Sequence, residues 1–215
     1  MEDQKKGIAN SLKILTDIFR LCKAEYRIIG SVLLVAYKNQ VFRRIGDVDI
    51  ILDAENKERV YKHLEAEGFR FTQKQWGGFH WVEGEKANHL ELTFFLVGKF
   101  TKEYFTWRFF KIGELRINAN YLKPTGYKFG GVTFIGIPIT SVVAGIKQAF
   151  LNPKRSLDKK ILREEIKSLK TSTYNSIHVY LGGIKIPYLY DVFSFLYNIY
   201  GGSRVLFGQR WEAWK

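Results

Sequence analysis

Two aspartates, Asp47 and Asp49, stand two positions apart in a stretch that is otherwise apolar. Side chains two apart on a β-strand point to the same face of a sheet, so both carboxylates project together while Val48 and Ile50 enter the core. Two ionised carboxylates held side by side repel each other, and a divalent cation relieves that repulsion. Magnesium prefers hard oxygen ligands, commonly one or two carboxylates together with phosphate oxygens of a substrate. The pair therefore predicts a metal site for phosphoryl chemistry.

A third acid, Glu91, lies between Leu90 and Leu92 in a run with the pattern of a strand. An acid inside so apolar a strand needs a partner. If its strand lies beside that of Asp47 and Asp49, three carboxylates converge at one end of the sheet, which suits two-metal phosphoryl transfer. We expect these three residues to hold Mg2+, with Mn2+ as a substitute. Glu91 would be either a metal ligand or the general base.

Five further residues are candidates for contacts with a nucleotide. Gly30 and Ser31 stand between a short strand and an apolar helical run. Glycine lets the backbone approach a phosphate closely, and the following helix would direct its N–H groups and positive end at that phosphate. Arg43 and Arg44 precede the acidic pair; a guanidinium matches a phosphate bidentately, although a solvated loop arginine explains either residue equally well. Lys147 would neutralise triphosphate charge or be an ordinary exposed helix lysine.

The elements that position these residues alternate between helix and strand in the first half of the chain. Helical spacing is found over residues 8–23, 32–37 and 57–68, and strand patterns over residues 26–29, 48–52, 69–71, 79–82 and 90–96. The second half has strand-like pieces between residues 113 and 137 and helical spacing over residues 141–150 and 158–169. We therefore predict an α+β fold with a mixed sheet and flanking helices. The expected organisation is a catalytic domain over residues 1–137 and a mainly helical C-terminal extension over residues 138–215.

The charge of the chain limits its partners. Among 215 residues the formal net charge is +13, spread along the sequence, so the summed field attracts anions such as nucleotides, nucleic acid or an anionic membrane surface. A single cysteine excludes an internal disulfide, and the four histidines lack zinc-ligand spacing. The N-terminus has no apolar core of a signal peptide, and no apolar stretch is long enough to span a membrane. We expect a cytoplasmic protein.

The order Gly30-Ser31, Arg43-Arg44, Asp47-Val48-Asp49 and then Glu91 resembles the signature of the polymerase-beta-like nucleotidyltransferase superfamily. The resemblance covers residues 1–95 and implies the nucleotidyltransferase fold, magnesium dependence and metal binding by the three acids. Within the superfamily, residues 31–50 are similar to the bacterial phosphocholine-transferase and fukutin group (LicD-type), although Lys38 stands where an arginine is usual.

A second group within the superfamily also matches. Antibiotic nucleotidyltransferases and abortive-infection toxins carry a helix lysine after an Ile-Pro pair, followed by an Arg/Lys-x-x-Asp segment. Ile137-Pro138, Lys147 and the segment from Lys154 to Asp158 resemble that arrangement.

The resemblance implies an enzyme that transfers a nucleotidyl or phosphoryl-linked group from a nucleotide donor to an acceptor hydroxyl. The donor would be a nucleoside triphosphate or a CDP-linked molecule, and the acceptor a sugar, another small molecule or RNA. The alternative is a catalytically silent nucleotide- or RNA-binding module of the same fold, which uses the positive charge to contact phosphates. A silent copy is free to lose an acid, and the presence of all three favours the enzyme.

Overall fold

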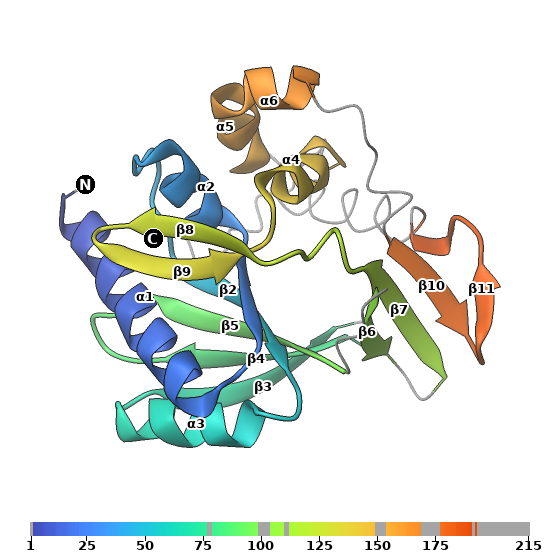
Figure 1. Ribbon diagram of the computed structural model, residues 1–215, viewed down its shortest axis with the longest axis horizontal. Coiled ribbons are helices and arrows are strands. Elements are labelled where there is room, and N and C mark those ends of the chain that lie inside the picture. The colour runs from blue at the N-terminus through green and yellow to red at the C-terminus, as the bar shows by residue number, and fades with distance from the viewer. Residues whose placement is uncertain are drawn as a thin grey trace, which may run out of the picture.

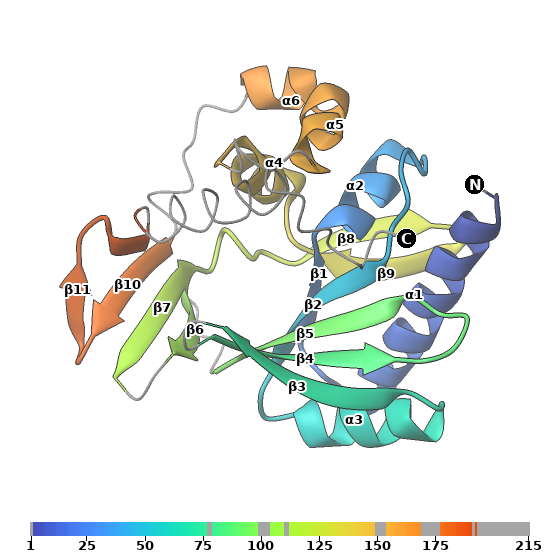
Figure 2. The same ribbon diagram turned by 180° about the vertical axis from the view of Figure 1, so that it is seen from behind.

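The computed structural model describes residues 2–76, 79–98, 104–109, 112–148, 154–168, 177–190 and 192. Its described helices are α1 (Glu2–Cys22), α2 (Ser31–Lys38), α3 (Lys57–Ala66), α4 (Ile139–Gln148), α5 (Lys154–Ile161) and α6 (Arg163–Ser168). The described strands form two sheets, which stand side by side in Figures 1 and 2. The larger sheet, which is mixed, and the flanking helices confirm the predicted α+β class.

The larger sheet supplies the scaffold for the predicted site. In sheet order its strands are β3 (Arg70–Trp76), β4 (Phe79–Glu85), β5 (Glu91–Val97), β2 (Asp47–Asp53), β1 (Tyr26–Ile29), β9 (Val132–Gly136) and β8 (Thr125–Phe129). β2 runs antiparallel to β1 and parallel to β5, so the sheet is mixed. The parallel pair requires a crossover, which α3, β3 and β4 provide.

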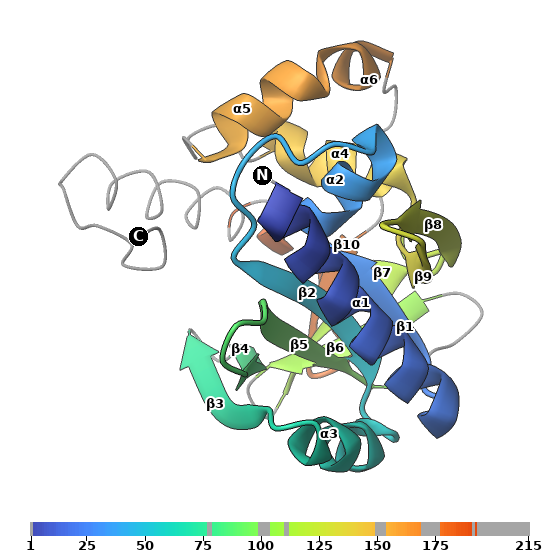
Figure 3. The same cartoon turned by 90° about the vertical axis from the view of Figure 1, so that its left-hand side faces the viewer.

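One face of this sheet is packed against helices. α1 lies in front of the strands in Figure 3, with α3 below them, and the apolar stripe of α1, including Leu12, Leu15 and Phe19, is buried in the core. On β2, Val48 and Ile50 are fully buried in the same core. Because alternate strand residues point to opposite faces, the aspartates on either side of Val48 project from the face that these helices leave open.

The smaller sheet joins distant parts of the chain. Its strands, in order, are β11 (Ile184–Ile186), β10 (Ile177–Leu181), β7 (Gly113–Asn118) and β6 (Tyr104–Phe109). β10 pairs with β7 in an antiparallel ladder that runs from Ile177 opposite Ile117 to Leu181 opposite Gly113. The predicted extension thus contains two strands as well as α4, α5 and α6. The predicted domain division at residue 137 falls between partners of one sheet and remains a proposal.

The C-terminal helices pack on the start of the fold. α4 contacts α2, α5 and α6, and the three gather above α2 in Figure 3. Lys38 at the end of α2 places its Nζ 2.5 Å from Oε1 of Glu165 on α6. No helix among the described residues has the length and apolar character needed to cross a membrane.

Candidate functional site

The three predicted carboxylates come from two neighbouring strands. In the parallel ladder between β2 and β5, Asp47 is the partner of Glu91, and Asp49 is the partner of Thr93. Directly paired residues share a face of the sheet, as do residues two apart on one strand. Asp47, Asp49 and Glu91 therefore lie on the same face and at the same end of the large sheet.

Glu91 is surrounded by negative charge. Partial burial raises its pKa, and the carboxylates of Glu83, Asp47 and Glu85 raise it further, while Lys74 opposes them. The ionised form of Glu91 is unfavourable in these surroundings, and a bound cation would offset the repulsion between the carboxylates. The donor set consists of hard carboxylate oxygens, which fits Mg2+ or Mn2+.

The strand register places the three carboxylates near one another, but their side chains do not form a cluster arranged to hold a metal ion. In the part of the chain that the structure describes, no three His, Cys, Asp or Glu side chains are grouped so that they could hold a metal ion. Binding of a cation at this end of the sheet therefore requires the acidic side chains to turn towards one another.

Gly30 forms the turn that brings the first residues of α2 beside the acids. It precedes α2 with φ +73° and ψ −145°, a backbone conformation open to glycine but strained for other residues. A Cβ atom on Gly30 would lie 2.3 Å from Oδ2 of Asp49, so the turn lies against that carboxylate and has no room for a side chain. α2 thus begins next to Asp49, and its first N–H groups are at the acidic end of the sheet, where a helix N-terminus favours phosphate.

Arg43 is held by a carboxylate from the other half of the chain. Its Nε lies 3.0 Å from Oδ1 of Asp158, and its Nη2 lies 3.3 Å from Oδ2 of the same residue. Arg155 donates from Nη1 to that Oδ2 at 2.9 Å. The Asp158 side chain is 0% exposed, so two arginines neutralise a fully buried carboxylate.

The same arginine reaches the start of α2, because Nη2 of Arg43 also donates to Oγ of Ser31. The four residues Ser31, Arg43, Arg155 and Asp158, which we call the buried clamp, connect α5 to the turn at Gly30. Arg43 therefore has a positioning contact within the protein, and its contact with a phosphate stays a prediction. Sequence reasoning placed Asp158 only within the Arg/Lys-x-x-Asp resemblance.

The two other predicted cations are less defined. Arg44 is exposed, and its carbonyl oxygen accepts from Nη1 of Arg43 at 3.2 Å. Lys147 lies on α4, but its side chain is outside the described part of the structure. Both stay predictions as nucleotide contacts.

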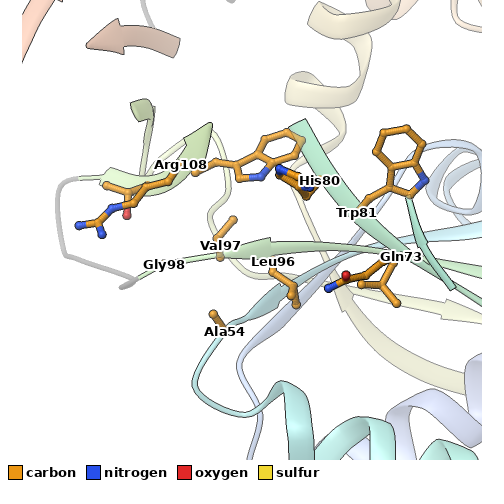
Figure 4. A pocket seen from close by; sticks show the side chains of 11 residues that line it. Ala54, Gln73, His80, Trp81, Leu96, Val97, Gly98 and Arg108 are labelled. Carbon is orange, nitrogen blue, oxygen red and sulfur yellow. The ribbon is translucent and has the colours of Figure 1, made fainter. Parts of the chain in front are cut away.

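A pocket of about 480 Å3 opens at the opposite end of β5 (Figure 4). β4 pairs with β5 over Val82–Gly84, and beyond this ladder the amide of Gly98 donates to the carbonyl oxygen of Thr106 in β6 at 2.8 Å. The pocket is lined by Ala54, Gln73, His80, Trp81, Val82, Leu96, Val97, Gly98, Thr106, Trp107 and Arg108. Leu96 is five residues from Glu91, a separation of about 17 Å along a strand, so the pocket is distinct from the carboxylates.

Comparisons with known proteins identify the fold. No model of a protein family and no curated protein sequence matches the chain. The crystal structure of the lincosamide antibiotic adenylyltransferase LnuA, lincomycin-bound, is similar with a TM-score of 0.60 and 17% identity, over 75% of this chain and 97% of that one. The solution structure of the antibiotic-resistance factor ANT(2'')-Ia is similar with a TM-score of 0.54 and 11% identity, over 75% and 90%.

The crystal structure of ANT(2'')-Ia in complex with adenylyl-2''-tobramycin gives a TM-score of 0.54 at 13% identity, over 75% of this chain and 93% of that one. At these identities the likeness concerns the fold. The chain has the α+β fold of these adenylyltransferases.

Proposed function

We propose that this protein is a nucleotidyltransferase-type enzyme, which transfers a nucleotidyl group from a nucleoside triphosphate to an acceptor hydroxyl. The observation that carries the proposal is the register of β2 against β5, which pairs Asp47 with Glu91 while the Gly30 turn presses on Asp49. Acidic side chains and a helix N-terminus thus meet at one end of the sheet, and together they suit a metal-bound triphosphate.

Each residue has a role in this proposal. The N–H groups at the start of α2 bind phosphate oxygens of the donor, and the buried clamp fixes that turn through Ser31 and Arg43. Asp47, Asp49 and Glu91 would hold Mg2+ or Mn2+, which would supply Lewis-acid stabilisation of the phosphate charge.

The transfer needs a base for the acceptor hydroxyl. The raised pKa of Glu91 brings that carboxyl closer to neutral pH, which favours it as the proton acceptor. The acceptor oxygen forms a bond to the α-phosphorus, the bond from that phosphorus to the pyrophosphate oxygen breaks, and the hydroxyl proton moves to Glu91. Glu91 serves either this role or that of a metal ligand.

The structural neighbours favour an adenylyl donor. One neighbour is a lincosamide adenylyltransferase and another is in complex with adenylyl-2''-tobramycin, whereas neither is a phosphocholine transferase or has a CDP-linked donor in its description. We therefore propose ATP as the first donor to test. A small molecule and RNA both remain acceptor classes within the proposal.

Replacement of Asp49 by Asn tests the enzyme against the binding module. The change keeps size but removes a ligand charge, so a metal-dependent transferase should lose several orders of magnitude in turnover. A module that only binds phosphate should instead hold ATP more tightly, because a negative charge beside the anion is gone. The measurements are magnesium-dependent product formation and ATP affinity without metal, with the exposed Asp17→Asn on α1 as the charge-matched control.

Tighter ATP binding by the Asp49→Asn variant, combined with no turnover by the wild-type protein on a broad panel of donors and acceptors, would reject the transferase. The binding module would then take its place.

A further inference from the structure

The smaller sheet has two unlike faces. Its apolar face is buried in the core through Phe105, Leu115, Ile117, Ile177 and Val179. The alternate residues form the opposite face, which we call the polar face: Tyr104, Thr106, Arg108, Glu114, Arg116, Asn118, His178, Tyr180 and Lys185. These residues are partly or fully exposed, and the sheet lies to the side of the large sheet in Figures 1 and 2. The polar face is therefore a surface distinct from the carboxylate end of β2 and β5.

Arg116 is at the centre of the polar face. Its guanidinium carbon lies 3.9 Å from the ring centroid of Tyr180 on β10 and 4.9 Å from that of Tyr104 on β6. Its Nε also pairs with Oε1 of Glu114 on the same strand. A planar cation is thus held between two aromatic rings that come from the strands on either side. These contacts fix the orientation of the two tyrosine rings and the guanidinium, on which the planar rings of a ligand can stack.

The charge of the polar face selects the kind of ligand. Arg108, Arg116 and Lys185 are cations, and Glu114 is the only acid of the set. Single-stranded nucleic acid has both complementary features, because its phosphates pair with lysine and arginine while its exposed bases stack on aromatic rings and guanidinium planes. A folded acidic partner would match the charge but would offer no flat rings to the Tyr104, Arg116 and Tyr180 row.

The pocket at the far end of β5 continues this surface. Thr106 and Arg108 belong to the polar face and also line the pocket, where His80 and Gln73 come from β4 and β3. Figure 4 shows His80 and Gln73 on the opposite side of the pocket from Arg108. A volume of about 480 Å3 lies within the range of small-molecule sites, and a glutamine amide can donate to and accept from the edge of a base.

We propose that the polar face of the smaller sheet binds single-stranded nucleic acid, with bases on the Tyr104, Arg116 and Tyr180 row and one base in the adjoining pocket. This binding does not depend on the transfer reaction. That the bound strand is also the acceptor rests on the proposed function, and a separate measurement tests it.

Fluorescence anisotropy of the full chain with fluorescein-labelled 12-mers of uridine (RNA) and thymidine (DNA) tests the binding. The Tyr180→Ala variant should bind about tenfold more weakly, whereas Tyr180→Phe keeps the ring and should bind as the wild type does. Lys185→Glu on the exposed strand β11 should weaken binding and flatten the dependence of affinity on salt, since it removes a phosphate contact. The matched control is Lys13→Glu, an exposed lysine on α1, which should change affinity far less.

Circular dichroism of each variant checks that the fold is retained. The proposal is overturned if neither 12-mer binds at low salt, or if Lys13→Glu and Lys185→Glu weaken binding equally. It is likewise overturned if a folded Tyr180→Ala variant binds as tightly as the wild type. Tighter binding of one of the two 12-mers shows whether the polar face prefers RNA or DNA, and either preference supports the proposal.

Transfer is measured separately, with ATP radiolabelled at the α-phosphate and with 12-mers that carry no label, because the β- and γ-phosphates leave as pyrophosphate. Label on the strand supports the strand as acceptor if the Asp49→Asn variant loses this transfer while it still binds the strand as tightly as the wild type. Transfer to small molecules by a protein that binds neither 12-mer overturns this inference and leaves the proposed function intact.

Discussion

Replacement of Asp158 by Asn should remove the charge that holds the buried clamp together. Asp158 is fully buried, and its carboxylate faces the guanidinium groups of Arg43 and Arg155, whose side chains are 11% and 25% exposed. Asn keeps the shape of Asp and one oxygen acceptor, but it leaves both arginines without their counter-charge. The variant therefore isolates the electrostatic part of the contact between α5 and the start of α2.

The expected loss is large for a single atom exchange. Removing one partner of a buried ion pair typically costs about 3–5 kcal/mol, because the remaining charge stays buried without compensation. The retained hydrogen-bond acceptor and the partial exposure of Arg155 put the estimate at the lower end, about 3 kcal/mol. For a chain of this length each kcal/mol moves the melting temperature by about 2–4 °C, so we expect a drop of roughly 6–12 °C.

Urea unfolding followed by circular dichroism, with a thermal scan as a second measurement, gives the free energy of unfolding. The control is Asp17→Asn, because the ion pair of Asp17 with Arg20 is exposed on α1 and should contribute less than about 1 kcal/mol. A double-mutant cycle with Arg43→Met should give a coupling energy above about 1 kcal/mol, since the two residues share hydrogen bonds. An Asp158→Asn variant as stable as the control, or a cycle with no coupling, would refute the clamp.

Three further substitutions test other contacts. Gly30→Ala forces a Cβ to within 2.3 Å of Oδ2 of Asp49 at φ +73°, so we expect about 1–2 kcal/mol of lost stability in urea unfolding and weaker magnesium-dependent ATP binding; unchanged ATP binding would show that Asp49 can move freely. Burial and neighbouring acids raise the pKa of Glu91 in the folded protein above its ordinary value of 4.5. The stability that protonated Glu91 contributes is fully present below that ordinary pKa and is lost as pH rises through the raised pKa of the folded protein. Glu91→Gln should therefore stabilise the metal-free protein at pH 7 and not at pH 4, and equal effects at both pH values in thermal scans would contradict the assigned charge environment. Finally, the hydroxyl of Tyr61 is buried without a hydrogen-bond partner in the part of the chain that is described, so Tyr61→Phe should leave stability unchanged or raise it by up to about 1 kcal/mol, and a loss above that value would reveal a contact for this hydroxyl.

Local pattern was sufficient to predict the strands of the site. Asp47 and Asp49 interrupt an alternating apolar segment, and Glu91 interrupts a continuous one. An acid in an apolar strand needs a partner, so each of these positions indicates a functional site. The register of Asp47 against Glu91 could not be predicted, because pairing between parallel strands is fixed by the crossover and by packing on the far face of the sheet. Adjacent strands were a condition of the predicted three-carboxylate site, and no residue-by-residue pairing followed from the sequence.

The buried clamp shows what local pattern misses. Arg43 and Asp158 are separated by 115 positions, and each has the sequence surroundings of an exposed charge. Only the packing of α5 near the start of α2 buries the carboxylate and gives Arg43 a positioning contact that its sequence surroundings do not indicate. β10 was missed for a related reason: its alternating residues Ile177, Val179 and Leu181 gain a buried face only through β7, a strand more than fifty positions earlier.

The position of Asp158 late in the chain has a consequence for protein synthesis. Every strand that carries an acid of the site, and the Gly30 turn beside them, is made before residue 98. Asp158 leaves the ribosome several seconds later, because translation adds about 5–20 residues per second. During that interval a nascent chain can pair β2 with β5 while Arg43 still lacks its carboxylate. The order of synthesis thus allows the sheet with its acids to form before the helix turn above them is fixed, and we expect a chain truncated before α5 to retain the sheet without the fixed turn.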